Sequence, residues 1–197
     1  MDRGRLRELH YISPIGNLAS IALRGILSHR QARAVEHQSV AMQEVQAIRA
    51  RKKVPGGRAL HEYVNLYVNG RNPMLFMRSA EFADLVVLRV SADVLDLPDV
   101  VVTDRNAASD WVRFAAAPGG LAIVSEEYTF AEYWTHPEDP IEQLRHKSRM
   151  CAEVLVPDRV PAEYIGAAYT ASADVLEKVR AVESGLRTTV NKRLFFR

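Results

Sequence analysis

The chain has 197 residues, of which 48% are hydrophobic and 25% charged, a composition that predicts one globular domain over residues 1–197. No apolar run approaches the roughly 20 residues that cross a bilayer, and the charged start MDRGRLRELHYIS argues against a secretory signal. The single cysteine, Cys151, excludes an internal disulfide framework, so we expect a reducing, cytoplasmic location and no membrane partner.

The net charge of +2 is unevenly distributed along the chain. Residues 1–60 contain 11 Lys and Arg against 4 Asp and Glu, whereas the remaining residues contain 15 against 20. This asymmetry indicates an N-terminal third that faces a polyanion. A solvated basic helix face is the alternative, and the charge alone does not separate the two.

Short strands alternate with helices in the first half of the chain. Alternating apolar residues predict strands over 9–13 and 62–68. Capping signals and apolar periodicity predict a helix between Asn17 and Gly25, a second over 40–53 and a third over 73–79. The second helix is expected to be amphipathic, with an apolar stripe formed by Val40, Ala41, Val45 and Ile48.

The second half of the chain is richer in strands. We expect them over 83–90, 99–104, 121–124, 151–156 and 163–170. Helical patterns cover 91–98, 139–150 and 172–183. The spacing is not that of regular βαβ units, and the strands alternate in polarity more than a doubly wound parallel sheet would. The sequence therefore predicts an α+β fold with mainly antiparallel sheets and a helical N-terminal part.

Several common sites are absent from the sequence. No GxGxxG or GxxxxGK[ST] motif is present, which removes support for dinucleotide-binding and P-loop folds. The six histidines never occur at HExxH or HxH spacing, so we expect no metal site. Cys151 precedes an apolar strand without an activating neighbour, which favours a buried structural thiol over a nucleophile.

One acidic residue interrupts an apolar strand. In RMCAEVLVPDRVP, residues 149–161, Glu153 lies between Ala152 and Val154. A carboxylate in apolar surroundings is costly unless it is paired, hydrogen-bonded or neutralised. By period-two alternation Glu153 shares a face with Cys151 and Leu155 and points into a core or into a cleft. A structural glutamate paired with an arginine is the alternative to a functional one.

Basic residues near two predicted helix ends are candidates for binding anions. Arg49 borders the apolar stripe of the helix over 40–53, whereas Arg51, Lys52 and Lys53 are freer to reach solvent. Arg71 lies beside a turn and a helix N-terminus, an arrangement that binds anionic groups. A turn arginine paired with a neighbouring acid is the alternative for Arg71.

Two polar segments combine turn residues with aromatic ones. The stretch TDRNAASDWVRF follows a predicted strand and is either a ligand-binding loop or a helix cap; its turn contains Asp104, Arg105 and Asn106. The stretch EEYTFAEYWTHP offers aromatic side chains that either stack on bases or seal the edge of a core: Tyr128, Tyr133 and Trp134.

Taken in order, five blocks resemble the DarT family of DNA ADP-ribosyltransferases, the toxins of bacterial toxin–antitoxin pairs. They are LHYISPIGNLASIALRGILSH, SVAMQEVQAIRARKKVPGG, LHEYVNLYVNGRNPMLF, TDRNAASDWVRF and CAEVLVPDRVP. The resemblance extends over nearly the whole chain. It implies an ADP-ribosyltransferase fold that cleaves NAD at the nicotinamide–ribose bond and transfers ADP-ribose to a thymidine or guanosine base in single-stranded DNA. It also implies a macrodomain antitoxin that removes the modification.

The resemblance also implies which residues form the site. The catalytic glutamate corresponds to Glu153, and a helical arginine that assists proton removal from the base corresponds to Arg49. The residues that correspond to the NAD-binding motifs are His10, Tyr11, Ser13, Asn17, Arg71 and Met74. The family's frequent YHITH start is HYISP here, with Pro14 in place of a histidine, so the resemblance leaves open whether His10 or Tyr11 contacts NAD.

The implied chemistry suits these residue types. Breaking the nicotinamide bond develops oxocarbenium-like charge on the ribose, which a carboxylate in a partly dry cleft stabilises. We therefore expect Glu153 to face an open pocket with Arg49 across the gap. Because arginine stays protonated, we expect Arg49 to polarise the base carbonyl and to steer phosphate. We assign Arg51, Lys52, Lys53 and Tyr133 to DNA binding.

Other functions stay open at this point. The same fold could act on RNA or protein, and a non-catalytic nucleic-acid-binding module could keep the fold without turnover. The presence of both Arg49 and Glu153 argues against the second of these.

Overall fold

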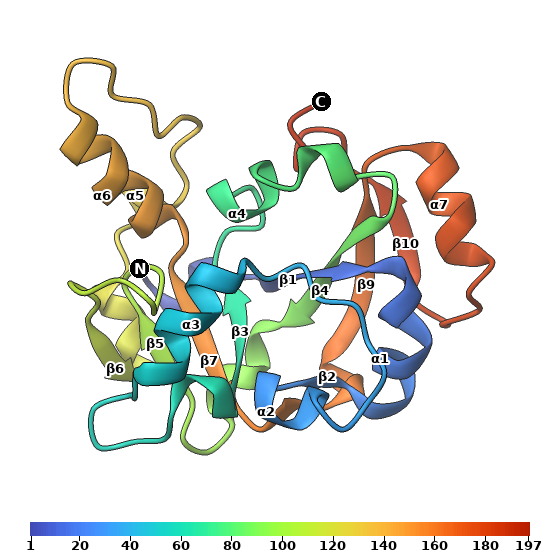
Figure 1. The fold of residues 1–197 in the computed structure, drawn as a ribbon, viewed down its shortest axis with the longest axis horizontal. Coiled ribbons are helices and arrows are strands. Elements are labelled where there is room, and N and C mark those ends of the chain that lie inside the picture. Colours follow the sequence, from blue (N-terminus) through green and yellow to red (C-terminus); the bar gives the residue numbers. More distant parts are fainter.

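An eight-stranded mixed sheet forms the centre of the computed structural model, which describes residues 1–197 (Figure 1). The strand order is β10-β9-β4-β1-β3-β7-β5-β6. Only β9 and β10 are parallel, and every other neighbouring pair is antiparallel. The strands are β1 (Glu8–Pro14), β3 (Tyr63–Tyr67), β4 (Leu85–Ser91), β5 (Val101–Thr103), β6 (Phe114–Ala116), β7 (Glu153–Pro157), β9 (Ile165–Thr170) and β10 (Arg187–Val190). The predicted α+β class with mainly antiparallel pairing is confirmed.

A second, two-stranded sheet and seven α-helices surround this centre. The small sheet pairs β2 (Ile26–Leu27) with β8 (Arg159–Val160). The helices are α1 (Leu18–Arg24), α2 (His29–Ala32), α3 (Gln43–Arg51), α4 (Pro73–Phe76), α5 (Glu126–Thr129), α6 (Pro140–Met150) and α7 (Ala173–Arg180). In Figure 1, α3 lies over β3 and β7, and α6 projects away from the sheet. None of these helices combines the length and the apolar character that crossing a membrane requires.

Short 3₁₀ turns connect many of these elements. They are η1 (Arg3–Arg5), η2 (Ile15–Asn17), η3 (Leu60–Glu62), η4 (Ser79–Glu81), η5 (Ala92–Asp96), η6 (Gly119–Ile123) and η7 (Ala162–Tyr164).

The two faces of the sheet pack into different apolar clusters. Alternate residues of β4 point to opposite sides, so Val86 and Leu88 join a cluster of 25 buried residues while Val87 joins one of 10. The same alternation along β7 places Val154 in the large cluster. Glu153 and the other odd-numbered residues of β7 therefore face the side that α3 covers. Each fully buried aliphatic side chain contributes about 1.5–3 kcal/mol, which fixes this register.

Two predicted elements differ from the structure. Residues 121–124 do not form a strand. Leu121 lies in the 3₁₀ turn η6, and the side chains of Leu121 and Val124 are buried in the large apolar cluster. The helix predicted over 40–53 begins only at Gln43, and its predicted apolar stripe is wrong. Ile48 is 44% exposed, and the buried residue of α3 is Arg49.

A polar network on β1 joins three neighbouring strands. The Glu8 carboxylate accepts hydrogen bonds from Arg89 on β4 and from the Tyr169 hydroxyl on β9, the latter at 3.0 Å, and lies 3.2 Å from His10 Nε2. Burial alone would raise the pKa of Glu8, but the hydrogen bonds from His10, Arg89 and Tyr169 outweigh it and lower the pKa to about 2.

This network predicts an acid-dependent loss of stability. The pKa of Glu8 is lower in the folded state than in the unfolded state. The ionised carboxylate therefore contributes fully to the free energy of unfolding above about pH 4.5, and this contribution is lost as the pH falls towards about 2. We expect Glu8→Gln to lower the free energy of unfolding at pH 7 by about 1 kcal/mol, since the group is partly screened by solvent. Urea denaturation at pH 7 and pH 3 measures this difference.

The exposed Glu163 provides the control, and Glu163→Gln should leave both unfolding curves unchanged. An equal loss for Glu8→Gln at the two pH values would contradict the proposed role of the ionised carboxylate.

Candidate active site

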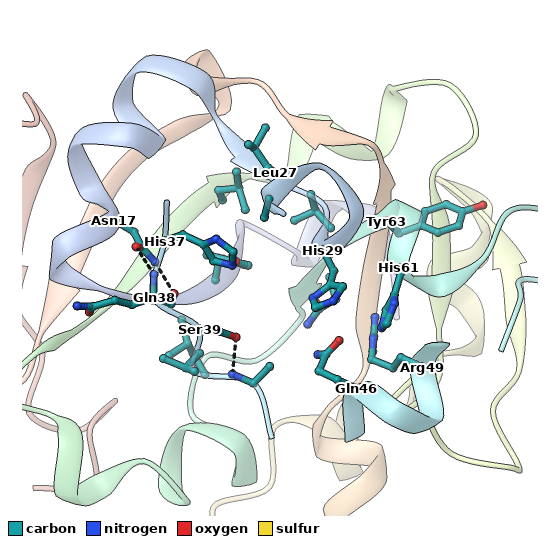
Figure 2. A pocket seen from close by; sticks show the side chains of 18 of the residues that line it. Asn17, Leu27, His29, His37, Gln38, Ser39, Gln46, Arg49, His61 and Tyr63 are labelled. Atoms are coloured by element: carbon teal, nitrogen blue, oxygen red, sulfur yellow. Dashed lines mark hydrogen bonds between the residues drawn. The ribbon is translucent and has the colours of Figure 1, made fainter. Parts of the chain in front are cut away.

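A cleft opens between α3, the segment 25–42 and the face of the sheet that α3 covers (Figure 2). Thirty residues line it, about half of them hydrophobic. The floor comes from β1, β3 and β7, and one wall comes from α3. The two residues expected to be catalytic, Glu153 and Arg49, are among the residues that line the cleft. The fold thus joins positions 104 residues apart in the sequence at one site.

Glu153 and Arg49 form a buried ion pair inside this cleft. Arg49 Nη1 donates to Glu153 Oε2 at 3.0 Å and to Oε1 at 3.3 Å. Glu153 is fully buried and Arg49 is only 4% exposed. The expectation of an open gap between the two groups is therefore wrong: both line the cleft, but they touch each other. The alternative of a glutamate paired with an arginine therefore describes the geometry of Glu153, and the pair lies at the cleft.

Backbone contacts fix Glu153 at the first position of β7. Its N–H donates to Thr103 Oγ1 at 3.1 Å, and it pairs with Tyr67 of β3 in the strand register. Burial raises the pKa of the Glu153 carboxyl, while the charge and hydrogen bond of Arg49 act in the opposite direction. Burial is the larger effect, so the carboxylate depends on Arg49 to remain ionised.

A connection between α2 and α3 forms the outer wall of the cleft and is held by Asn17. The Asn17 side-chain amide donates to the Gln38 carbonyl at 2.8 Å, and its Oδ1 accepts from the Gln38 N–H at 3.0 Å (Figure 2). Asn17 occupies the N-cap position of α1 as predicted but makes no side-chain capping bond, because both of its polar atoms bind Gln38.

Two histidines that sequence patterns did not single out lie beside Arg49. The rings of His29 and His61 stack with centroids 4.2 Å apart, and Figure 2 shows them next to Gln46 and Arg49. Burial is the largest effect that lowers the pKa of each ring; the neighbouring ring is next for His29 and Arg49 for His61. The only sequence signal was the presence of two histidines, since neither has metal-ligand spacing.

The residues assigned to NAD by resemblance divide into two groups. Tyr11, Asn17 and Met74 line the cleft. His10 and Ser13 are buried on β1 but do not line it: His10 faces Glu8, and the Ser13 hydroxyl donates to the Pro14 carbonyl at 3.1 Å. Of the two ring residues left open by the resemblance, the one at the cleft is Tyr11.

Arg71 is not among the residues that line the cleft. Its Nη1 donates to the Arg193 carbonyl at 2.8 Å, and its guanidinium stacks on the ring of Phe196 at 3.9 Å. The turn before α4 thus directs Arg71 towards the C-terminal segment, which the local pattern around Asn72 and Pro73 did not reveal.

The residues assigned to DNA differ in their surroundings. Arg51 and Lys53 are exposed at the end of α3, and Tyr133 is 69% exposed between α5 and α6. Lys52, in contrast, donates to the Ala108 carbonyl at 2.7 Å and to Asp110 Oδ1 at 2.8 Å. It therefore holds the 104–110 loop against α3.

Several side chains of that loop and of the aromatic segment make contacts within the protein. Asp104 binds Arg105 and Arg113 and so closes the loop, while Asn106 lines the cleft. Tyr128 lies under the Arg149 guanidinium, and Trp134 packs edge-on against Phe76 at 5.4 Å; both seal an edge rather than present a free stacking face.

Comparisons with known proteins agree with this architecture. The family model described as ssDNA thymidine ADP-ribosyltransferase, DarT, matches residues 10–194. A DNA ADP-ribosyl transferase–DNA ADP-ribosyl glycohydrolase fusion protein of Thermosipho africanus (strain H17ap60334) is 32% identical over 200 residues, which cover 96% of this chain and 47% of the fusion. The chain therefore spans about half the length of that relative.

Solved structures show the same fold. Thermus sp. 2.9 DarT in complex with ADP-ribosylated ssDNA has a TM-score of 0.82 at 26% identity, covering 96% of each chain. The same Thermus protein in complex with NAD+ has a TM-score of 0.77 at 24% identity, covering 96% of this chain and 98% of that one, which supports the fold alone.

The buried pair predicts a strong energetic coupling between two distant positions. Arg49→Leu leaves the Glu153 carboxylate buried without a partner, so we expect a loss of about 3–5 kcal/mol in the free energy of unfolding at pH 8. The loss should be smaller at pH 5, where the carboxyl can bind a proton. The double variant Arg49→Leu/Glu153→Leu should be more stable than Arg49→Leu alone. Guanidinium unfolding of these two variants and of Glu153→Leu alone measures the coupling. Additive losses would show that the pair is open in solution.

Proposed function

The chain belongs to the DarT family of ssDNA thymidine ADP-ribosyltransferases, and we propose from this membership that it transfers ADP-ribose from NAD+ to a thymine base in single-stranded DNA. The observation that carries the proposal is the Glu153–Arg49 pair at the cleft. Glu153 is the residue that the resemblance assigns to catalysis, and it begins β7. Guanosine is the other base to test. We propose that residues 1–197 act as one transferase domain.

Glu153 is proposed to stabilise the ribose during cleavage of NAD+. Loss of nicotinamide places positive charge on the ribose, and a carboxylate nearby stabilises that charge most in a dry site. Glu153 is fully buried at the first residue of a central strand, so its position is rigid. Such a preorganised group typically contributes roughly 3–4 kcal/mol to transition-state stabilisation.

Arg49 is proposed to bind the acceptor base rather than to deprotonate it. Its guanidinium stays protonated, and one of its nitrogens, Nη2, is buried without a hydrogen-bond partner. That nitrogen is free to donate to a carbonyl oxygen of the base, which acidifies the adjacent ring N–H. The geometry thus offers one charge for the ribose and an opposite one for the base.

The roles proposed for the other residues that the resemblance assigns to NAD+ depend on whether each residue lines the cleft. We propose that Tyr11, Asn17 and Met74 contact NAD+, which enters as co-substrate, and that His10 and Ser13 act by fixing β1. Arg71 is proposed to hold the C-terminal segment near the cleft rather than to bind NAD+ directly. No group of metal-ligating side chains accompanies the site.

The biological role is proposed from relatives. One relative carries a DNA ADP-ribosyl glycohydrolase in the same chain, so we propose that this chain is a toxin whose modification a macrodomain antitoxin removes. A cytoplasmic location is proposed because DNA is the substrate.

Mass spectrometry of single-stranded oligonucleotides incubated with the protein and NAD+ tests the function. We expect thymine-containing oligonucleotides to gain one ADP-ribose. Glu153→Gln should lower the rate by about 10²–10³-fold without loss of fold, whereas Arg49→Ala should still bind NAD+ but modify no DNA. Glu163→Gln is the matched control. Modification of RNA or protein in place of DNA, or no consumption of NAD+ by the wild type, would disprove the proposed activity.

The basic end of α3 predicts salt-dependent DNA binding. We expect the logarithm of the association constant to fall linearly with the logarithm of salt concentration, and Arg51→Ala and Lys53→Ala each to reduce the slope by about 0.7. Arg187, exposed on the edge strand β10, serves as control. Slopes measured by fluorescence anisotropy that are equal in all variants would exclude phosphate contacts at α3.

A further inference from the structure

Three buried polar atoms without hydrogen-bond partners gather in the cleft. Of seven such side-chain atoms in the chain, three belong to cleft-lining residues: Gln46 Oε1, Arg49 Nη2 and His61 Nε2. Gln46 and Arg49 are one turn apart on α3, and Figure 2 shows His61 beside both. Buried polar atoms are nearly always paired in native proteins, so a group of unpaired ones at a cleft indicates a place where a ligand supplies the partner.

One ring nitrogen of His61, Nε2, is buried without a hydrogen-bond partner, and His61 lines the cleft. In the neutral ring that carries its proton on Nδ1, Nε2 has a lone pair, which is a proton acceptor.

The surroundings of His61 keep the ring neutral. Burial and the positive charges of Arg49 on α3 and Arg33 after α2 lower the pKa of His61, and the nearby backbone of Gln46 opposes them. His29 of α2 stacks on the ring, and its pKa is lowered as well. A neutral histidine at neutral pH is suited to accept a proton.

The proposed transfer requires such an acceptor, and the other groups at the cleft do not supply it. The base loses its ring N–H proton when the new bond forms. Arg49 is already protonated. Both oxygens of Glu153 are occupied by Arg49, and protonation of Glu153 would remove the charge that stabilises the ribose.

We propose that His61 is the general base of the transfer, an inference that rests on the function proposed above. His61 Nε2 takes the ring N–H proton of the thymine, whose carbonyl oxygen accepts a hydrogen bond from Arg49 Nη2. The nitrogen lone pair forms a bond to C1 of the ribose as the bond from that carbon to the nicotinamide nitrogen breaks. The bonding electrons stay on nicotinamide, which leaves neutral. His61 later releases the proton to solvent.

Two variants of His61 test the assignment. In His61→Ala and His61→Gln, DNA modification should slow by about 10²–10⁴-fold, whereas hydrolysis of NAD+ in the absence of DNA should change less than about threefold, because water attack on the ribose cation needs no strong base. Added imidazole should restore DNA modification to His61→Ala by at least about tenfold. His136→Gln, on the segment before α6 and outside the cleft, is the matched control.

The pH dependence provides a readout that a purely structural role would not change. The wild-type rate of DNA modification should rise with pH along a limb that lies below the ordinary histidine value of 6.5, since only neutral His61 is active. In His61→Ala this limb should disappear, and the rate should follow the free-base fraction of added imidazole. Far-ultraviolet circular dichroism and NAD+ binding report on folding of both variants.

The results of these experiments distinguish the proposed role of His61 from the proposed transferase function. Unchanged DNA modification in the His61 variants, or an equal fall in DNA modification and NAD+ hydrolysis without rescue by imidazole, overturns the role of His61 and leaves the proposed function standing. A wild-type protein that neither cleaves NAD+ nor modifies DNA overturns the proposed function itself, and this inference with it.

Discussion

The contact between the Glu153 carboxylate and the Arg49 guanidinium is the constraint on which the arrangement of the cleft depends. Helix α3 has nine residues and buries only Arg49 among them. A helix this short is not stable on its own, so its position must come from tertiary contacts. The ion pair and the contacts of Lys52 to the 104–110 loop supply polar ones. The groups proposed to act on substrate are thus also the groups that attach α3 to the sheet.

The proposed double role offers a reason for a buried ion pair at this position. Two charges withdrawn from water are often no more stable than apolar residues of similar volume. The Glu153 carboxylate has no contact with solvent, and Leu155, two residues further along β7, belongs to an apolar cluster. An apolar pair at 49 and 153 would remove both of these charges from the cleft. The Glu153–Arg49 ion pair is thus an energetically costly interaction at a strand position that borders the cleft.

Sequence patterns predicted the parts of the fold that depend on local periodicity. The strands predicted over 83–90 and 151–156 and the helix predicted over 139–150 are present at 85–91, 153–157 and 140–150, because β-forming runs and helix capping are local signals. The exposure of Ile48 and the burial of Arg49 could not be predicted, because they depend on which face of α3 meets a residue 104 positions later. The same applies to Arg71, whose partners come from the C-terminal segment.

In the candidate site, the sequence could identify only residues whose type is unusual for their local surroundings. Glu153 was singled out because a carboxylate in an apolar strand is physically unusual. His61 was not, since its distinctive property is an unpaired nitrogen beside Arg49, and this becomes visible only when η3 and α3 are packed together.

The proposed reaction uses the pair in a way that keeps the charge of the cleft constant. Before substrate enters, the negative charge of Glu153 and the positive charge of Arg49 compensate each other. During transfer, the ribose becomes positive next to Glu153 while negative charge develops on the carbonyl oxygen of the base next to Arg49. Each partner of the pair then lies next to a developing charge of opposite sign, so no net charge has to be buried at the transition state. A dry cleft strengthens both interactions, because opposite charges attract more strongly where water is excluded.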